Sequence, residues 1–527
     1  MNPQRVIIIG GGLGGLFTGA LLSKEGYRVT VLEQNPVAGG GLQTFTRAGV
    51  TFETGMHTLG GLRPGGSIHK LCHYLGILDG LRLRDVDTGC MDVITYLSIH
   101  NEECRMHNCQ LPTGNGQFPT FAVPSGREAF TDYFARCFPG EAEGVRRYVE
   151  ALYRLAGEVD FFYLRSGRDD LFAHSPEFLW PASGLISHYI KDERLRDLLA
   201  YMNPMYGGVY GHTPAYIHAL INVLYIDGPS RFVGGSQQMA DALAGVIAQG
   251  GGQVVTSARV TSVSVSTDRQ CTHVTTADGH DYRADLYISA IHPARLVSMT
   301  TPGAFTKAYT SRVTTIPNTC SAFTVYIKLR PGVFPYINHT CYFQDGIGRV
   351  WHHADYDPAD PDWPHGFMYM TPASSDAQQW ATTMIVNCLM PFSAVSPWQH
   401  TTVGHRGPDY LEWKQRLARR VLYRLEQLHP GFHQAVDQWW AASPLTIRDY
   451  YGQPEGALYG VRKDCHDIVR SQLPIATKVR NLLLTGQNIN LHGICGVPLT
   501  AVNTVEAIVG RGHLVDKINK AYSVINF

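Results

Sequence analysis

Uninterrupted apolar runs mark two strands of this chain, one near each end. Val6–Ile9 is a continuous run of β-branched and apolar residues, and Leu482–Leu484 is a second apolar run close to the C-terminus. A strand that is buried on both faces of a parallel sheet has such a run, because neither of its faces meets water. We therefore expect both segments to be buried strands of an α/β fold.

The residues after the first run have the pattern of a strand–helix–strand unit. Leu16, Ala20 and the leucines that follow fit a helix that Gly26 ends. Residues 27–34 then have the pattern of a second strand, and an acid, Glu33, stands at its end. This order is typical of a βαβ unit.

A later region repeats the mixture of helix and strand. Residues 237–249 have apolar side chains at helical spacing, and a single strand is expected over 253–265. Asp278-Gly279 is typical of a tight hairpin turn, after which the chain returns to the sheet.

The two long stretches between these regions differ from them. Residues 95–225 are helical and rich in aromatic side chains, such as Phe161–Tyr163 and Phe178–Trp180. Residues 300–450 alternate strands with one amphipathic helix, which Pro430-Gly431 ends. The aromatic side chains suit either a hydrophobic core or the wall of an apolar tunnel, and the pattern leaves both open.

Glycines give the first unit its chemistry. Gly10, Gly12 and Gly15 match G-x-G-x-x-G directly after the first strand. The first glycine allows a tight turn, the second lets the backbone approach a pyrophosphate, and the third allows close helix–strand packing. Free N–H groups and the helix dipole favour an anion at this helix start.

The acid at the end of the second strand completes a nucleotide site. Glu33 stands about twenty residues after the glycines, where a carboxylate can accept hydrogen bonds from a ribose hydroxyl. The sequence therefore predicts a dinucleotide site, and this unit alone leaves NAD and FAD open.

Composition narrows the class of protein. The chain has 527 residues, which is more than a single hydrophobic core usually supports, so at least two domains are expected. Lys+Arg and Asp+Glu both number 44, and this balance offers no basic excess to attract nucleic acid. No apolar run approaches the roughly 18 residues that span a bilayer, and no signal peptide is expected. We expect a cytoplasmic protein, with contact to a membrane surface left open.

Cysteines and histidines give no metal-binding pattern. The 11 cysteines form no C-x-x-C pair, which is typical of reduced thiols rather than of a disulfide framework or a zinc site. His352-His353 has no partner at ligand spacing, so no metal site is predicted.

A second glycine cluster and a T-G-x-H segment resemble one family of FAD enzymes. Gly39–Gly41 follows the ribose acid closely, and residues 52–61 read FETGMHTLGG. The first 60 residues resemble FAD enzymes of the superfamily of phytoene desaturases, carotenoid isomerases and retinol saturases (all-trans-retinol 13,14-reductases). Residues 52–61 are similar to the F-D-T-G-x-H-Y-x-G segment of the retinol saturases and carotenoid isomerases. Bacterial phytoene desaturases usually carry arginine where Gly41 stands, so the retinol saturase and carotenoid isomerase branch is the better match.

The resemblance implies FAD and a set of contacts to it. Val260 would meet the adenine through its backbone, and residues 39–42 would lie against the diphosphate and ribityl chain. Near the C-terminus, Pro498 is expected at the first position of a helix from about Leu499 to Ile508. The N-terminus of that helix would point at the flavin and stabilise its anionic reduced form.

We therefore expect non-covalent FAD in an α/β flavoprotein with two dinucleotide-binding folds. The expected cofactor contacts are Gly10, Gly12, Leu13, Gly14, Gly15, Glu33, Gln34, Gly40, Gly41, Leu42, Thr54, Gly55, Met56, His57, Val260, Gly486, Gln487, Gly496, Val497 and Pro498. Residues 1–95, 226–300 and 451–527 would form a Rossmann-like FAD domain, and residues 96–225 and 301–450 an inserted α+β substrate domain.

The function that the resemblance implies is hydride exchange at a carbon–carbon bond. The substrate would be an apolar isoprenoid, polyene or retinoid-like lipid, and the reaction a desaturation, saturation or isomerisation at flavin N5. His57 is the candidate general acid, and the alternative is a histidine that only holds a hydrogen bond beneath the flavin. The electron donor or acceptor and the oligomeric state stay open.

Two other functions fit parts of the pattern. One is an amine-oxidase-like flavoenzyme on a smaller substrate, against which the T-G-x-H segment speaks. The other is a prenyl-lipid carrier like the GDP dissociation inhibitors, which share this fold without FAD. Intact glycines and Glu33 argue against a carrier.

Overall fold

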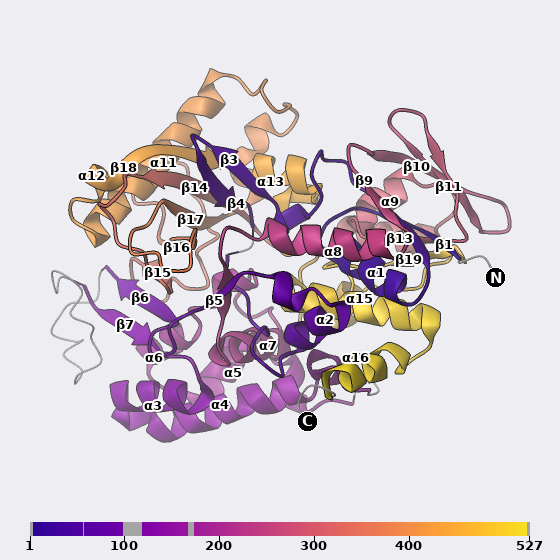
Figure 1. The fold of residues 1–527 in the computed structure, drawn as a ribbon. Coiled ribbons are helices and arrows are strands. Elements are labelled where there is room, and N and C mark those ends of the chain that lie inside the picture. Colours follow the sequence, from indigo (N-terminus) through magenta and orange to yellow (C-terminus); the bar gives the residue numbers. More distant parts are fainter. Residues whose placement is uncertain (1–3, 56, 98–117, 167–172, 524–527) are drawn as a thin grey trace.

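A five-stranded parallel sheet forms the centre of one part of the molecule (Figure 1). The computed structural model describes residues 4–55, 57–97, 118–166 and 173–523. Across the sheet the strands follow the order β19 (Leu482–Leu484), β13 (Leu286–Ser289), β1 (Arg5–Ile9), β2 (Arg28–Leu32) and β9 (Gln253–Val255). Three stretches far apart in the sequence therefore build one sheet, and both apolar runs are strands of it, as predicted.

The two faces of this sheet are covered by different layers. Val6 and Ile8 of β1 pack with α1 (Leu13–Lys24), α8 (Gln237–Gln249) and α15 (Gly493–Val509). Ile7 and Ile9 point the other way, into a core with the three-stranded sheet and two short helices. Those elements are β10 (Val260–Val265), β11 (Cys271–Thr276), β12 (Asp281–Tyr282), α9 (Pro293–Met299) and α10 (Lys307–Thr315). Burial on both faces is why β1 carries no polar alternation.

A seven-stranded mixed sheet forms the second part. In order its strands are β18 (Val436–Ala442), β14 (Ser321–Leu329), β17 (Thr383–Met390), β16 (Gly366–Met370), β15 (Thr340–Gln344), β6 (Asp92–Tyr96) and β7 (Thr120–Val123). The amphipathic helix α11 (Pro408–Leu428) packs its apolar side chains on Phe323, Val325 and Ile327 of β14. The alternate residues of β14 are left for the opposite face.

Helices complete the second part and enclose its sheet from below in Figure 1. They are α3 (Arg127–Cys137), α4 (Ala142–Gly157), α5 (Ala182–Tyr189), α6 (Glu193–Leu199) and α7 (Ala215–Ile226). The apolar helix α7 is buried along nearly its whole length. The remaining elements are β3 (Thr44–Arg47), β4 (Val50–Glu53), α2 (Ser67–Leu75), β5 (Leu83–Asp85), β8 (Ser230–Phe232), α12 (Phe432–Ala435), α13 (Pro444–Tyr451), α14 (Ile468–Ser471) and α16 (His513–Ser523).

The structure corrects three local predictions. The strand expected over 253–265 is two strands in different sheets, because Ser257 turns the chain with a φ of 54° between them. The C-terminal helix begins at Gly493, so Pro498 lies inside α15 rather than at its first position. Cys137 is disulfide-bonded, so the expectation of reduced thiols is wrong there, because pairing of scattered cysteines depends on the fold. The hairpin at Asp278-Gly279 is confirmed.

The expected division into an FAD domain and a substrate domain stays a prediction. The boundary expected after residue 95 falls within β6, which pairs with β15 and β7 in the seven-stranded sheet.

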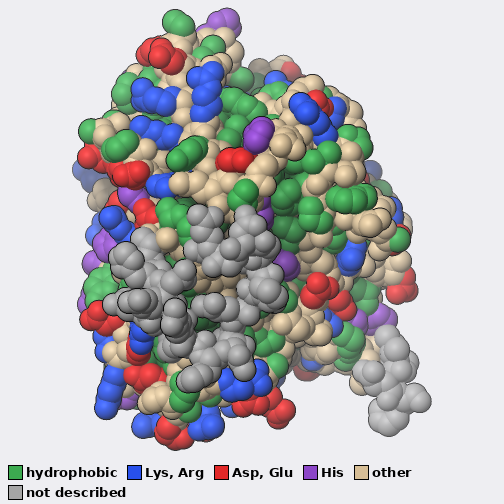
Figure 2. Space-filling view, turned by 90° about the vertical axis from the view of Figure 1, so that its left-hand side faces the viewer, with side chains coloured by type: hydrophobic (Ala, Val, Ile, Leu, Met, Phe, Trp, Pro, Cys, Tyr) green, Lys and Arg blue, Asp and Glu red, His purple; other side chains and the backbone are tan. Residues whose placement is uncertain are grey.

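Charged side chains of both signs occur on the face shown in Figure 2, with hydrophobic side chains between them.

Helix length in the described part of the chain bears on membrane contact. No single helix there has the length and apolar character needed to cross a bilayer. Only α15 and α16 taken together pass such a test, and the two meet at a bend of 119°.

Candidate flavin and substrate cavity

A cavity of about 620 Å³ lies where the two parts of the molecule meet. Its wall comes from the glycine loops after β1 and β2, from β10, from β14 and β17 of the larger sheet, and from α7, α13 and the start of α15. The carboxyl ends of the parallel strands therefore open into it, which is where α/β sheets bind ligands.

The start of α1, at one end of this cavity, has the geometry of an anion site. Gly10 turns the chain out of β1 with a φ of 102°, and Gly12 precedes the helix in an extended conformation. No side chain caps the helix, so the N–H groups of its first turn stay available to a phosphate.

Two glycines of α1 have no room for a side chain. A Cβ on Gly15 would lie 1.9 Å from the carbonyl oxygen of Gly10, and one on Gly14 would lie 2.8 Å from the Cα of Gly486. This is the close helix–strand packing that the motif predicts. Gly12 and Gly41 differ, because a Cβ there would meet nothing nearer than 3.9 Å and 4.0 Å.

Glu33 is held rigidly beside the anion site. Its Oε2 accepts a hydrogen bond from the Gly11 amide at 2.8 Å, and its Oε1 accepts one from the Asn35 amide at 2.8 Å. Burial raises the pKa of Glu33, and these amide hydrogen bonds oppose that rise. The carboxylate lines the cavity with remaining lone pairs that a ribose hydroxyl can use.

The predicted cofactor residues are brought together with few exceptions. Those that line the cavity are Gly10, Gly12, Leu13, Gly14, Glu33, Gln34, Gly40, Gly41, Leu42, Thr54, Gly55, His57, Val260, Gly486, Gln487, Gly496 and Val497. Gly15 and Pro498 are buried in packing and do not line it, and Met56 lies outside the described residues. Contact of these residues with FAD stays a prediction.

The first turn of α15 reaches the same cavity. Gly493 starts the helix with a φ of 75°, and residues 493–497 all line the cavity. No side chain caps this helix. Because Pro498 lacks an N–H, it cannot donate the usual helix hydrogen bond to the carbonyl of Ile494.

His57 is oriented by a carboxylate that the sequence did not point to. Its Nδ1 lies 3.2 Å from Oε2 of Glu53 on β4, and both side chains are largely buried, with 7% and 4% exposed. A hydrogen bond from Nδ1 to the carboxylate leaves Nε2 as the ring nitrogen available in the cavity. Glutamate four residues before the histidine was the available signal.

The second histidine of the cavity, His492, is neutral and has no carboxylate partner among the described residues. Burial, and next the charge of Lys463, lower the pKa of His492 to about 3, so its imidazole is neutral at physiological pH. Its buried Nε2 has no hydrogen-bond partner in the described structure, and its ring lies 5.2 Å from that of Tyr459. It can donate or accept a hydrogen bond but holds no extra proton.

Two arginines that line the cavity were not predicted from the sequence. Arg259 and Arg295 line the cavity near Val260, and Glu33 is the only acidic side chain among its described lining residues. Burial, then the charge of Arg259, lower the pKa of Arg295, yet a guanidinium stays charged at neutral pH. No glycine motif pointed to α9, so only the fold could reveal this positive charge.

The other end of the cavity is apolar. Ile217, Leu220, Ile221 and Leu224 of α7 line it, together with Leu389, Met368 and Leu458. Phe162 is part of this wall, whereas Phe178 packs in the core and stacks on Tyr216 at 4.5 Å. The aromatic stretches of the sequence thus divide between the two roles that were left open.

Tyrosines at the junction of the two ends are bonded to backbone carbonyls. Tyr459 donates to the oxygen of Pro204 at 2.9 Å, and Tyr225 to that of Thr58 at 3.3 Å. Their aromatic faces are left for a ligand, while their hydroxyls hold chain segments together.

Known proteins resemble this chain along its whole length. Human all-trans-retinol 13,14-reductase is 25% identical over 557 aligned positions, covering 98% of this chain and 88% of the human protein. The 4,4'-diapolycopene oxygenase of a Methylomonas species is 24% identical, covering 95% and 97%. A solved structure of putrescine oxidase with putrescine bound has the same fold, with a TM-score of 0.60, 14% identity and coverage of 100% and 99%.

A family model establishes the class of protein. The model described as flavin containing amine oxidoreductase matches residues 13–319, more than half of the chain. The match includes α1, the second glycine loop, the T-G-x-H segment and β10. The resemblance to FAD enzymes and the two-part α/β fold are thereby confirmed, and the chain belongs to the flavin containing amine oxidoreductase family.

Proposed function

We propose that the protein is a non-covalent FAD enzyme that transfers hydride to or from a carbon–carbon unit of an apolar, elongated polyene or isoprenoid. The observation that carries this proposal is the cavity itself, in which a backbone-lined anion site is continuous with an apolar chamber. Full-length similarity to a retinol reductase and to a carotenoid oxygenase supports the same substrate class.

The nucleotide end fits FAD because its helix starts are uncapped and the Glu33 carboxylate has lone pairs left for a ligand. The uncapped start of α1 and Arg295 would hold the diphosphate, Glu33 the ribose, and the uncapped start of α15 the flavin ring. When bound, flavin supplies hydride transfer at N5, and the protein supplies orientation and charge. Among the described residues that line the cavity, Cys495 is the only cysteine. Burial raises the pKa of its thiol to about 12, which disfavours a covalent bond to the flavin and favours non-covalent binding.

The apolar end would position the substrate and exclude water. The isoleucine and leucine side chains of α7 that line the cavity carry no polar group, so an isoprenoid chain could be buried against them without breaking a hydrogen bond of theirs. His57 would donate or accept a proton at Nε2, while Glu53 fixes its tautomer and orientation through Nδ1.

The amine-oxidase-like alternative has less support from the cavity. An amine substrate is a cation at neutral pH, and a carboxylate would stabilise it. Glu33 is the only acidic residue among the described lining residues, and both of its oxygens are engaged at the nucleotide end. The carrier alternative leaves the anion site without a ligand.

A flavin assay tests the proposal first. The purified protein should show a flavin spectrum, and heat or acid should release about one FAD per chain, as non-covalent binding requires. Substrate turnover is then measured with retinoid, carotenoid and amine panels under one electron donor or acceptor at a time. A colourless protein that cannot be reconstituted with FAD would contradict every enzymatic reading, and turnover of amines alone would favour the alternative.

The role of His57 is tested by His57→Gln with His492→Gln as the matched control in the same cavity. Loss of a general acid or base typically costs about 10²–10⁴-fold in turnover, and FAD content should not change. The control should retain turnover because the pKa of His492, about 3, leaves its imidazole neutral and only weakly basic at neutral pH, which suits neither a general acid nor a general base. Equal activity of both variants would assign His57 a structural role.

A further inference from the structure

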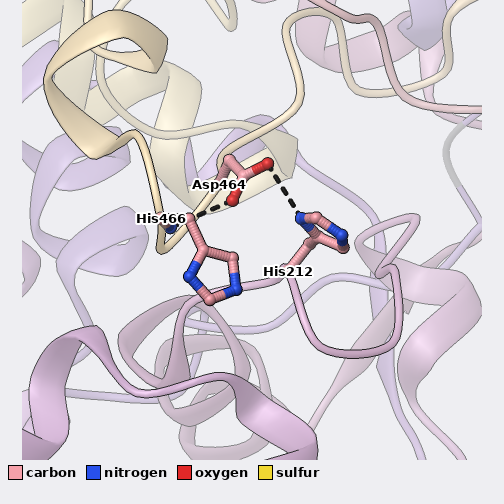
Figure 3. Close-up of side chains that lie close together, drawn as sticks. All are labelled: His212, Asp464 and His466. Atoms are coloured by element: carbon pink, nitrogen blue, oxygen red, sulfur yellow. Dashed lines mark hydrogen bonds and ion pairs between the residues drawn. The ribbon is translucent and has the colours of Figure 1, made fainter.

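We propose that His212, Asp464 and His466 form a binding site for a divalent transition metal, with Zn²⁺ the best-suited ion. One ring nitrogen of each histidine and one carboxylate oxygen lie within 4.8 Å of one another. Figure 3 shows the three side chains converging from two separate loops. The proposal is independent of the flavin function.

The ligand types favour zinc and its neighbours. Imidazole nitrogen together with one carboxylate suits Zn²⁺, Co²⁺ and Ni²⁺, whereas Mg²⁺ and Ca²⁺ prefer sites made of oxygen alone. Three protein ligands leave one tetrahedral position for water or another donor. Nε2 of His466 donates a hydrogen bond to the carbonyl oxygen of Gly211 at 2.9 Å, and this bond would have to break if Nε2 is the ring nitrogen that binds the metal.

The spacing of the ligands is close to that of an occupied site. Two ligands about 2.1 Å from a tetrahedral zinc lie about 3.4 Å apart. His212 Nδ1 lies 3.0 Å from Asp464 Oδ2, so this pair needs little change. The imidazole of His466 is exposed at the surface and can move the remaining distance without repacking a core.

Backbone contacts hold the two loops in this arrangement. The amide of Cys465 donates to the carbonyl of His212 at 2.8 Å, and the amide of His466 donates to Oδ1 of Asp464 at 3.0 Å. The loops are 252 residues apart in sequence, so the fold rather than a local motif creates the site. A competing cation is present, since Arg462 lies 3.5 Å from Asp464 Oδ2, and the metal would have to displace it.

The two loops that carry the proposed metal site follow segments of the cavity wall. The loop with His212 follows Pro204 and Met205, and the loop with Asp464 follows Leu458 and Tyr459, all of which line the cavity. A metal that joins the loops would therefore tie together two segments of the cavity wall, and it would stabilise the folded state by binding there.

Titration with zinc chloride tests the site in the full-length protein as purified, after a chelator has removed any bound metal. Isothermal titration calorimetry should give one tight zinc per chain, and zinc should raise the melting temperature. His212→Ala and His466→Ala should each weaken zinc binding at least about 10-fold, which is the lower end of the cost of losing even a supporting group. Circular dichroism checks that both variants fold.

The matched control is His352→Ala, because His352 Nδ1 also lies 3.0 Å from an aspartate, Asp355, on the surface. This control should bind zinc like the wild type. The double variant His212→Ala/His466→Ala keeps every cysteine, so a zinc that persists in it would overturn the proposal. Equal weakening by the control variant would overturn it as well.

Discussion

At the nucleotide end of the cavity, the wall is largely backbone: glycines at positions 10, 12, 14, 40 and 41, and the uncapped starts of α1 and α15. At the apolar end, the wall consists of side chains from α7, β14 and β17. In the proposed function the first end would bind through N–H groups at fixed positions, and the second through shape and exclusion of water.

The difference teaches where each end tolerates change. Around the start of α1, a side chain added at Gly14 or Gly15 would meet main-chain atoms, which cannot rotate away, whereas Gly12 and Gly41 have room for a Cβ. A side-chain wall fails more gradually, because apolar residues of similar volume can replace one another. Four substitutions test this contrast, in order of falling effect.

Gly15→Val should have the largest effect. Its Cβ would lie 1.9 Å from the Gly10 carbonyl oxygen, so we expect a loss of about 3 kcal/mol or more in the free energy of unfolding, and loss of bound FAD. Urea denaturation and flavin content measure both. Gly41→Ala is the control, since the nearest atom there is 4.0 Å away; if it fails like Gly15→Val, packing is not the cause.

Glu33→Gln should weaken FAD binding without harming the apolar end. Hydrogen bonds to charged groups contribute about 1.5–3 kcal/mol, so we expect about 10- to 100-fold weaker binding. Equilibrium ultrafiltration measures the dissociation constant of FAD. At saturating FAD the KM for an apolar substrate should stay at the wild-type value, and a raised KM would show that the two ends are not independent.

Ile221→Asn should have the opposite effect, which is weaker turnover of the substrate at unchanged FAD affinity. Ile221 lies on the cavity side of α7 and is only partly buried, so an amide there meets the substrate rather than the core. An unpaired polar group costs about 1–3 kcal/mol, and we expect kcat/KM for an apolar substrate to fall about 10-fold. FAD affinity should not change, and Ile221→Leu should retain turnover. A flavin defect in Ile221→Asn would contradict the contrast.

His492→Gln, at the junction of the ends, should change only stability at acid pH. Because the pKa of His492 is about 3 in the folded protein and about 6.5 when unfolded, the unfolded chain takes up a proton first as the pH falls. Stability is therefore lost below pH 6.5, by at most about 1.4 kcal/mol per pH unit from this group. Urea midpoints at pH 5 and pH 7 should differ less in the variant than in the wild type.

Sequence patterns were most informative where a residue's role depends on its neighbours along the chain. Gly10, Gly15 and the run Val6–Ile9 act within one strand–turn–helix unit, and the structure places them as expected. Local patterns failed at Ser257 and Pro498. There an unusual φ and contacts from other segments decide whether a strand breaks and where a helix starts.

The Glu53–His57 pair, the guanidinium of Arg295 and the His212–Asp464–His466 cluster have a different origin. Arg295 and the cluster depend on segments that meet only after folding. Glu53 and His57 are only four residues apart, but their burial depends on the elements packed around them.

By itself the sequence determined the βαβ unit, the glycine-rich start of its helix, the position of Glu33 at the end of its second strand, and the family, since all of these are encoded in contiguous residues. Only the tertiary structure decided which apolar side chains face the cavity and which charges lie beside it. Alternation along α7 or β14 defines the two sides of an element, but the packing of the whole fold decides which side meets a ligand.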